Sequence, residues 1–175
     1  LYKFSVKAVG GDVALYKLTF AVSSSTAPAG QAGATTSLFS LYAYTDSGFS
    51  QADTTFSSDG LLNAQQCARS RPVTTSAVGE RIATDINPNG SGHPVEIFPD
   101  KSATACNTGT ATTTYVVASG QTRYFRLAAT VGTVEGVSGQ ESFQVDLQGD
   151  AAFPVGHQAG LNQPGEMGNS GNNTG

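Results

Sequence analysis

The residues best spaced for chemistry lie between Asp85 and Glu96. Asp85, Asn87 and Asn89 occupy alternate positions, Gly90 comes next, and Glu96 is the twelfth residue counted from Asp85. Oxygen ligands at positions one, three and five, glycine at six and a carboxylate at twelve are the spacing of a calcium loop. The flanks are typical of strands rather than helices, however, and Asn-Pro-Asn-Gly is itself strong turn chemistry. The pattern leaves two interpretations open, a calcium site and a plain turn, and no other cofactor is expected.

A pair of tyrosines, Tyr42 and Tyr44, occupies alternate positions of a predicted strand, which places them about 7 Å apart on one face. Exposed aromatic faces at that spacing can stack on sugar rings through their negative π-faces. The chain has no tryptophan, the favoured stacking platform, and Leu38 shares the same face. The tyrosines therefore indicate either a carbohydrate-binding surface or a second core layer or lateral contact.

The chain contains two cysteines, Cys67 and Cys106. A disulfide between them would close a loop of about 40 residues, worth roughly 4 kcal/mol in the chain-entropy model. A bridge fits the extracellular composition described below, and two separate free thiols are the alternative. A zinc site is not expected, because His93 and His157 lie in loop-like contexts and no CxxC spacing occurs.

Catalytic chemistry finds little support in the sequence. His93 and His157 have no nucleophile at a recognisable spacing, and the few carboxylates fit turns or exposed strand faces, so we expect that the chain is not an enzyme. An intramolecular isopeptide bond would need a buried lysine beside an asparagine and an acid. Lys3, Lys7 and Lys17 fall on the predicted solvent faces of their strands, which disfavours such a bond.

Strands must position all of these residues. Residues 1–9 and 13–22 flank Gly10-Gly11-Asp12, and in both segments apolar side chains fall on the even-numbered positions. The odd-numbered positions of the first segment hold Lys3, Ser5 and Lys7. A period of two is what a half-buried antiparallel sheet requires. The two segments are therefore predicted to form a hairpin that pairs locally, or else a hinge that sends residues 1–9 to another sheet or subunit.

Further strands are predicted by the same alternation. The expected segments are residues 37–45, 80–86 with 94–98 as a hairpin, 112–118, and 121–132 with 141–147 as a second hairpin. A short helix capped by Asp59, or an irregular edge strand, is expected over residues 59–65. Eight or nine short strands with turn signals about every ten residues favour an all-β sandwich over a βαβ fold.

Composition bounds the class of protein. The chain has 175 residues, 13% charged residues, a net charge of −4 and no basic cluster, so a nucleic-acid partner is not expected. No apolar run is long enough to span a membrane. Residues 1–153 are predicted to form one domain, and residues 154–175, rich in glycine, asparagine and glutamine, a flexible tail or linker. Sparse charge with abundant threonine is typical of secreted or surface proteins, and a chain that starts at Leu1 is expected to be processed or part of a longer one.

Several stretches resemble a known group of modules. They are residues 1–8 with 11–20, residues 41–47, and residues 118–127 with 145–150. These strand patterns resemble the largely uncharacterised immunoglobulin-like β-sandwich modules of exported surface proteins from candidate-phylum bacteria. The resemblance implies an extracellular module without catalytic residues.

The leading hypothesis is therefore a non-enzymatic structural module of a cell-surface protein. It would contact other copies of itself or neighbouring surface domains, and it would form fibres if the strand that opens the chain adds to a neighbour's sheet. A carbohydrate-binding module that uses Tyr42 and Tyr44, with glycans as partners, is the alternative.

Overall fold

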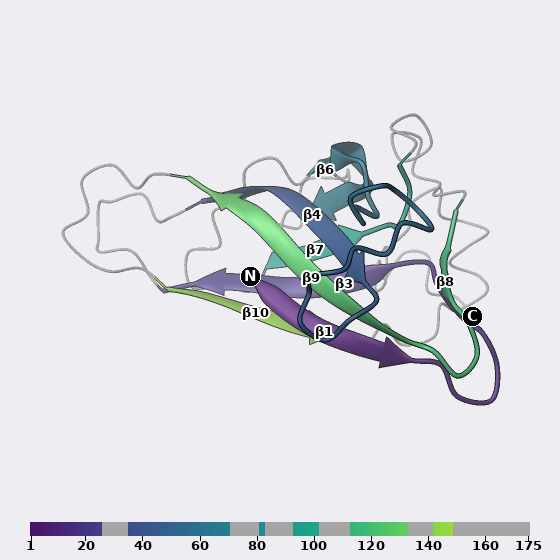
Figure 1. Ribbon diagram of the computed structural model, residues 1–175. Coiled ribbons are helices and arrows are strands. Elements are labelled where there is room, and N and C mark those ends of the chain that lie inside the picture. The colour runs from purple at the N-terminus through teal and green to yellow at the C-terminus, as the bar shows by residue number, and fades with distance from the viewer. Residues whose placement is uncertain (26–34, 71–80, 83–92, 102–112, 133–141, 149–175) are drawn as a thin grey trace, which may run out of the picture.

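The protein is an all-β structure in the part of the chain that a computed structural model describes, residues 1–25, 35–70, 81–82, 93–101, 113–132 and 142–148 (Figure 1). These ranges contain ten strands, one three-residue 3-10 turn and no α-helix. In these ranges no helix is long and apolar enough to cross a membrane. The elements are β1 (Tyr2–Lys7), β2 (Val13–Leu15), β3 (Leu18–Ser24), β4 (Thr36–Tyr44), η1 (Gln65–Cys67), β5 (Ala68–Ser70), β6 (Arg81–Ile82), β7 (His93–Ile97), β8 (Tyr115–Val117), β9 (Thr122–Val131) and β10 (Phe143–Gln148).

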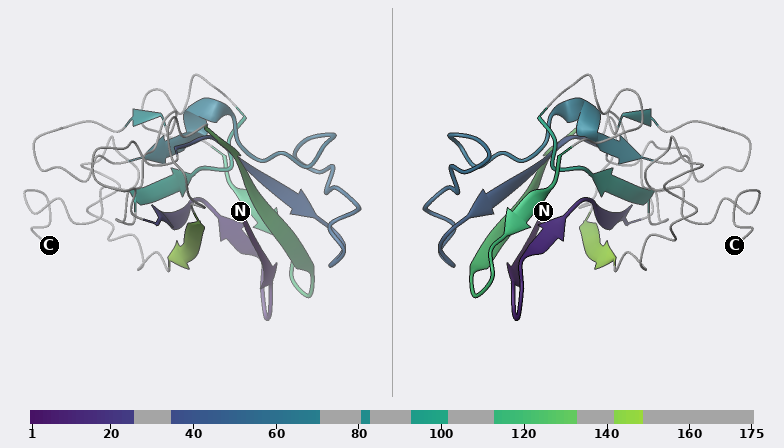
Figure 2. Two further views of the ribbon diagram at one scale, coloured as in Figure 1. Left: turned by 90° about the vertical axis from the view of Figure 1, so that its left-hand side faces the viewer. Right: turned by 90° about the vertical axis from the view of Figure 1, so that its right-hand side faces the viewer.

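The strands form three antiparallel sheets. A three-stranded sheet has the order β1-β9-β4, a five-stranded sheet has the order β10-β3-β7-β5-β6, and β2 pairs with β8. Figure 2 shows the two larger sheets as layers that face each other, with β1 and β10 on the same flank of the molecule. In Figure 1, β1 and β10 run in the same direction along that flank.

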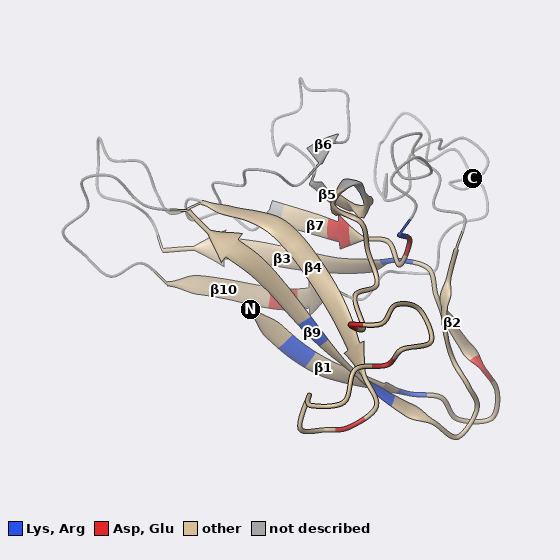
Figure 3. Cartoon of the chain, turned by 45° about the horizontal axis from the view of Figure 1, so that its top comes forward, with Lys and Arg blue, Asp and Glu red and all other residues tan. Residues whose placement is uncertain are grey.

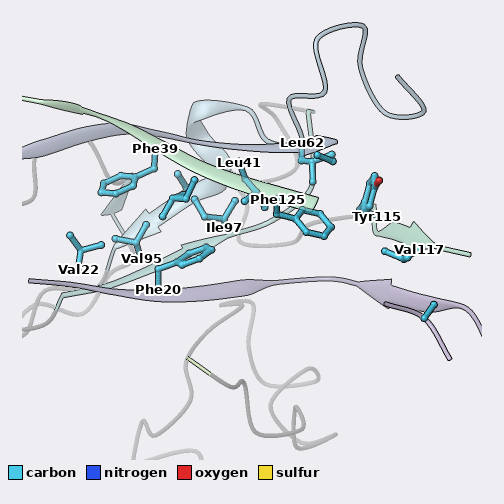
Figure 4. Close-up of a cluster of buried hydrophobic side chains, with 14 residues drawn as sticks. Phe20, Val22, Phe39, Leu41, Leu62, Val95, Ile97, Tyr115, Val117 and Phe125 are labelled. Carbon is cyan, nitrogen blue, oxygen red and sulfur yellow. The ribbon is translucent and has the colours of Figure 1, made fainter. Parts of the chain in front are cut away.

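The core fills the space between these two layers (Figure 4). Leu41 and Phe125 come from the three-stranded sheet, and Phe20 and Ile97 from the five-stranded sheet; all four are fully buried. Phe4 stacks on Phe125 with ring centroids 5.0 Å apart and contacts Phe20 at 6.0 Å. Such aromatic contacts stabilise a core beyond the area they bury, so β1 is anchored to both layers.

The local hairpin predicted for residues 1–22 is wrong, and the alternative, a hinge that sends residues 1–9 to another sheet, is the one observed. β1 pairs with β9 and not with its sequence neighbours, and the segment after Gly10 divides into β2, which pairs with β8, and β3, which pairs with β10 and β7. Gly10, at φ 79°, makes a turn that passes the chain from one sheet to another. The alternation predicts which side chains face inward, but it holds no information on which strand will be the partner.

The two later hairpins are also wrong in their pairing. β6 and β7 both pair with β5, which lies between them. β9 and β10 belong to different sheets. Most of the described strands overlap the predicted segments, but β5 lies where no strand was predicted, and the predicted segment 13–22 divides into β2 and β3. The described ranges therefore hold ten strands rather than eight or nine.

The segment between β4 and η1 follows the edge-strand alternative and not the helix. Leu61 bridges to Tyr42, and the Leu62 N–H donates to the Leu41 carbonyl at 2.8 Å. The buried Asn63 side chain continues the pairing: its Oδ1 accepts from the Leu41 N–H at 2.8 Å, and its Nδ2 donates to the Phe39 carbonyl at 3.0 Å. This segment therefore covers the edge of β4 that faces away from β9.

Lys17 departs from the prediction that its side chain faces solvent. The residue is only 7% exposed, and its Nζ lies 3.1 Å from Oε1 of Glu96, which is 5% exposed. Both side chains lie on the face of the five-stranded sheet opposite to Phe20 and Ile97. An isopeptide bond at Lys17 was disfavoured because its amine was predicted to face solvent. The burial of Lys17 contradicts that prediction. The predicted tail, residues 154–175, lies outside the described residues.

Candidate functional site

The outer face of the three-stranded sheet gathers cations and aromatic rings. In the register of the sheet Lys3, Arg126 and Tyr42 form one row across the three strands, and Ser5, Tyr124 and Tyr44 form the next. Figure 3 shows the basic positions on β1 and β9. We call this surface, made of Lys3, Lys7, Tyr42, Tyr44, Phe49, Tyr124 and Arg126, the basic aromatic face.

The two tyrosines predicted to bind sugar lie side by side but differ in access. Phe49 packs edge-on to Tyr44, with ring centroids 5.5 Å apart, and to Tyr124 at 6.1 Å. Tyr44 is therefore only 6% exposed, whereas Tyr42 is half-buried. A ligand on this face would meet Tyr42 and the outer side of Phe49, over whose ring Lys3 Nζ lies at 4.3 Å.

Arg126 lies between the two tyrosines. Its Cζ is 5.0 Å from the ring centroid of Tyr42 and 5.3 Å from that of Tyr44. Its Nε is buried and bonds to no described residue. Within the described ranges no carboxylate lies at ion-pair distance from Arg126, Lys3 or Lys7. The face thus holds three cations whose charge is not neutralised by those parts of the chain.

The loop that carries Phe49 is held by Asp46. The carboxylate accepts from the backbone N–H of Gly48, Ser50 and Gln51, the last at 2.7 Å. The Gln51 N–H is the main cause that lowers the pKa of Asp46. Phe49 itself adopts φ 57°, a left-handed conformation that costs a non-glycine residue about 1 kcal/mol. The hydrogen bonds to Asp46 and the ring contacts offset that cost and hold Phe49 over the sheet.

A buried polar network ties the same loop to β8 and β9. Asp53 is 2% exposed; its Oδ2 accepts from the Tyr115 hydroxyl at 2.7 Å and from Arg123 Nε, and its Oδ1 accepts from the Thr55 N–H at 2.9 Å. Burial alone would raise the pKa of Asp53, but the hydrogen bonds from Thr55, Tyr115 and Arg123 outweigh it and lower the pKa to about 2. Burial and the Asp53 contact raise the pKa of Tyr115. The Asp53 carboxylate thus accepts from three donors, two of which lie on β8 and β9. These contacts position the loop relative to the two strands.

The outer sides of β1 and β10, which are edge strands among the described residues, form a second candidate surface. No described strand pairs with the outer side of β1 or of β10. The apolar side chains of these two strands are half-buried and pack against the core; they are Tyr2, Phe4 and Val6 on β1 and Phe143, Val145 and Leu147 on β10. An edge strand with unpaired backbone groups is a template for another strand.

Of the residues predicted to bind calcium, the structure describes only Glu96. Glu96 lies on β7 with its Oε1 on the Lys17 ammonium, whereas Asp85, Asn87 and Asn89 lie outside the described residues. Among the residues that are described, no three His, Cys, Asp or Glu side chains cluster as a metal site would require. Calcium binding stays a prediction.

The predicted disulfide also stays a prediction. Cys67 is fully buried at the end of η1 beside Phe98, and Cys106 lies outside the described residues. His157 is outside them as well. His93 was expected in a loop, and this is wrong, because His93 is the first residue of β7.

Sequence reasoning missed Arg126, Lys3 and the Asp53 network. Arg126 and Lys3 could have been found by placing the outward positions of residues 1–9 and 121–132 beside Tyr42, had the pairing been known.

Comparisons of the chain with protein-family models, curated proteins and solved structures found no match.

Proposed function

We propose that this chain is a non-enzymatic structural module of an extracellular surface protein, with an immunoglobulin-like β-sandwich fold, and that it joins copies of itself through its free sheet edges. The observation that carries the proposal is the pair of edge strands β1 and β10. Each has six residues with strictly alternating half-buried and exposed side chains. Edges of this length are normally shielded in a protein that stays alone.

The role of β1 differs from the one expected from the sequence. β1 lies in its own sheet, paired with β9 along its whole length, so it is not a strand that swings out to a neighbour. It offers its open side to an incoming strand instead. This is β-augmentation, in which main-chain hydrogen bonds supply affinity and alternate side chains supply specificity. The proposal includes assembly of many copies into a fibre. The mass of the assembly in solution tests that part of the proposal.

Sedimentation velocity of the full chain over a wide concentration range tests the proposal. We expect mass to increase with concentration, and we expect the increase to be lost in Ser5→Pro. The Ser5 N–H points away from β9, so proline removes a donor from the open edge and none from the β1–β9 ladder. Ser5→Ala is the matched control, and circular dichroism verifies that each variant is folded. A chain that remains monomeric at every concentration would refute the proposal.

A second function, glycan binding on the basic aromatic face, is supported by the geometry of Arg126 and Tyr42. The half-buried ring of Tyr42 is the more accessible of the two tyrosines and can stack on a sugar, and the un-neutralised Arg126 and Lys3 beside it favour a sugar that carries a carboxylate or sulfate. A glycan array is the direct test, with acidic sugars expected to bind.

Variants separate this function from non-specific attraction. Tyr42→Ala is expected to lose binding by tenfold or more, as removal of a stacking platform would (about 1.4 kcal/mol). Arg126→Gln should lose acidic but not neutral sugars. Thr130→Ala, an exposed position on the same strand, is the control. Binding that Tyr42→Ala leaves unchanged would contradict a glycan site on this face.

A further inference from the structure

We infer that two copies of the chain join by parallel pairing of β1 of each copy with β10 of the other, which closes a two-fold dimer. The inference rests on the proposed self-association and names its junction. It follows from the direction of the unpaired backbone groups, the faces on which the side chains lie, and the charges along the two edges.

The open edge of β1 presents the backbone of its odd-numbered residues. The Ala8 N–H donates to the Gln121 carbonyl at 3.0 Å, in register with the β1–β9 ladder. Hydrogen-bonded pairs alternate along an antiparallel ladder, so the even-numbered residues of β1 bond to β9. The N–H and C=O groups of Lys3, Ser5 and Lys7 therefore point to the open side, and the side chains of these three residues are exposed on the outer face.

The open edge of β10 has the opposite relation between backbone and side chains. The Ser25 N–H donates to the Ser142 carbonyl at 2.9 Å, in register with the β10–β3 ladder. The even-numbered residues of β10 therefore bond to β3, and the outward backbone groups belong to Phe143, Val145 and Leu147. These are the residues whose side chains face the core.

Only parallel pairing matches the faces of these two edges. In an antiparallel pair, two residues whose backbone N–H and C=O groups point at each other lie directly opposite, and their side chains lie on the same face of the sheet. Lys3 or Ser5 would then lie opposite Val145, so polar side chains of one strand would share a face with apolar side chains of the other. In a parallel pair, a residue whose backbone N–H and C=O groups bond across the junction lies beside a residue whose own backbone groups point away from the junction. Ser5 then lies beside Asp146, and Phe4 lies beside Val145. The polar outer faces and the apolar inner faces of the two sheets both continue across the junction.

Charge along the edges favours this partner over the alternatives. With all six residues of each strand overlapped, Asp146 lies beside Ser5 and diagonally between Lys3 and Lys7. Antiparallel pairing of β1 with a second β1 would instead place Lys3 opposite Lys7, and like charges that face each other across a ladder are destabilising. Figure 3 shows the same contrast, with basic positions on β1 and an acidic one on β10.

The position of the two edges closes the assembly. β1 and β10 lie on one flank and run in the same direction (Figure 1). A two-fold axis parallel to the strands exchanges the two layers and keeps the strand direction. It therefore places β1 of each copy beside β10 of the other. Both junctions form in one pair of copies, neither β1 nor β10 keeps an open side, and the contact is self-complementary.

Disulfide trapping tests the junction. Adjacent strands lie about 4.8 Å apart, within the range that a disulfide bridges, so a cysteine at position 5 should reach one at position 146 of the other copy. Under mild oxidation, we expect a mixture of Ser5→Cys and Asp146→Cys chains to give a mixed dimer. Neither variant alone should be trapped, and the Ser5→Cys/Asp146→Cys double variant should stop at a dimer. Thr130→Cys is the control for random collision.

Each other outcome overturns the inference in a recognisable way. Efficient trapping of Ser5→Cys alone would mean that β1 pairs with β1. A ladder of multimers from the double variant would mean an open fibre, and a bridge within one chain would mean that β1 closes on its own β10. Failure to trap a chain that self-associates in sedimentation would refute the junction and leave the proposed function standing. A chain that is monomeric in sedimentation would refute both.

Discussion

The buried Asp53 carboxylate should make the stability of this protein depend on pH in the acidic range. Its pKa is about 2 against an ordinary value of 3.8, so the folded state binds a proton less readily than the unfolded state. A carboxylate with a depressed pKa contributes stability that is complete above its unfolded pKa and is lost as pH falls through its folded pKa. The stabilising contribution should therefore be constant above about pH 5 and disappear between pH 5 and pH 2.

The size of the effect follows from the shift. At about 1.4 kcal/mol for each pKa unit, a depression from 3.8 to about 2 corresponds to about 2 kcal/mol of unfolding free energy. Asp53→Asn should lose this pH-dependent part. It should also cost about 3 kcal/mol at neutral pH, because it leaves Arg123 without a carboxylate. Tyr115→Phe removes one of the hydrogen bonds at a cost of about 1 kcal/mol and should bring the pKa of Asp53 closer to 3.8.

Urea unfolding at a series of pH values is the assay, at a protein concentration low enough to exclude self-association. The unfolding free energy of the wild-type chain between pH 6 and pH 2 should fall by about 2 kcal/mol more than that of Asp53→Asn. Asp146→Asn removes an exposed carboxylate and should leave the difference unchanged. Equal pH dependence in wild type and Asp53→Asn would refute the assignment of this term to Asp53.

Three further perturbations test other parts of the fold by chemical denaturation. Gly60→Ala should destabilise the protein by about 2 kcal/mol more than Gly10→Ala. Both glycines have a positive φ, but only at Gly60 would a Cβ approach the backbone, 2.6 Å from the Ala43 carbonyl oxygen. Equal losses of stability in the two variants would exclude this close approach. Lys17→Met should cost about 3 kcal/mol by leaving Glu96 without its ammonium, and Lys17→Met/Glu96→Leu should recover part of it; a single variant as stable as wild type would contradict the buried pair. Reduction of the chain should lower stability by about 4 kcal/mol if Cys67 is bridged to the other cysteine, and a peptide map without reductant that shows two free thiols would exclude the bridge.

The sequence predicted the strands and their faces because alternation is a local property. Tyr2, Phe4 and Val6 face the core and Lys3, Ser5 and Lys7 face solvent, as the period of two requires. The partner of each strand was not predictable in this way. Phe4 pairs with Phe125 and Phe20 with Leu147, and the local pattern of either strand is compatible with many partners.

The candidate site was predictable only in part, for the same reason. Tyr42 and Tyr44 were recognised on one face, but the cover that Phe49 provides depends on a loop whose conformation Asp46 holds by several backbone hydrogen bonds. Arg126 reaches the tyrosines because β9 pairs with β4. The burial of Lys17 was missed because a long side chain on the polar side of a strand was taken to reach water, whereas here its ammonium meets Glu96.

The connectivity of the sheets has a consequence for how the chain is made. No described ladder joins two strands across a tight turn, and β1 must wait for β9, so that Phe4 meets Phe125 only after about 120 more residues have been synthesised. At roughly 5 to 20 residues per second, β1 leaves the ribosome on the order of 6 to 24 s before its partner. High contact order also slows folding after synthesis. We therefore expect the alternating apolar side chains of β1 to stay without their partner strand until β9 has been synthesised.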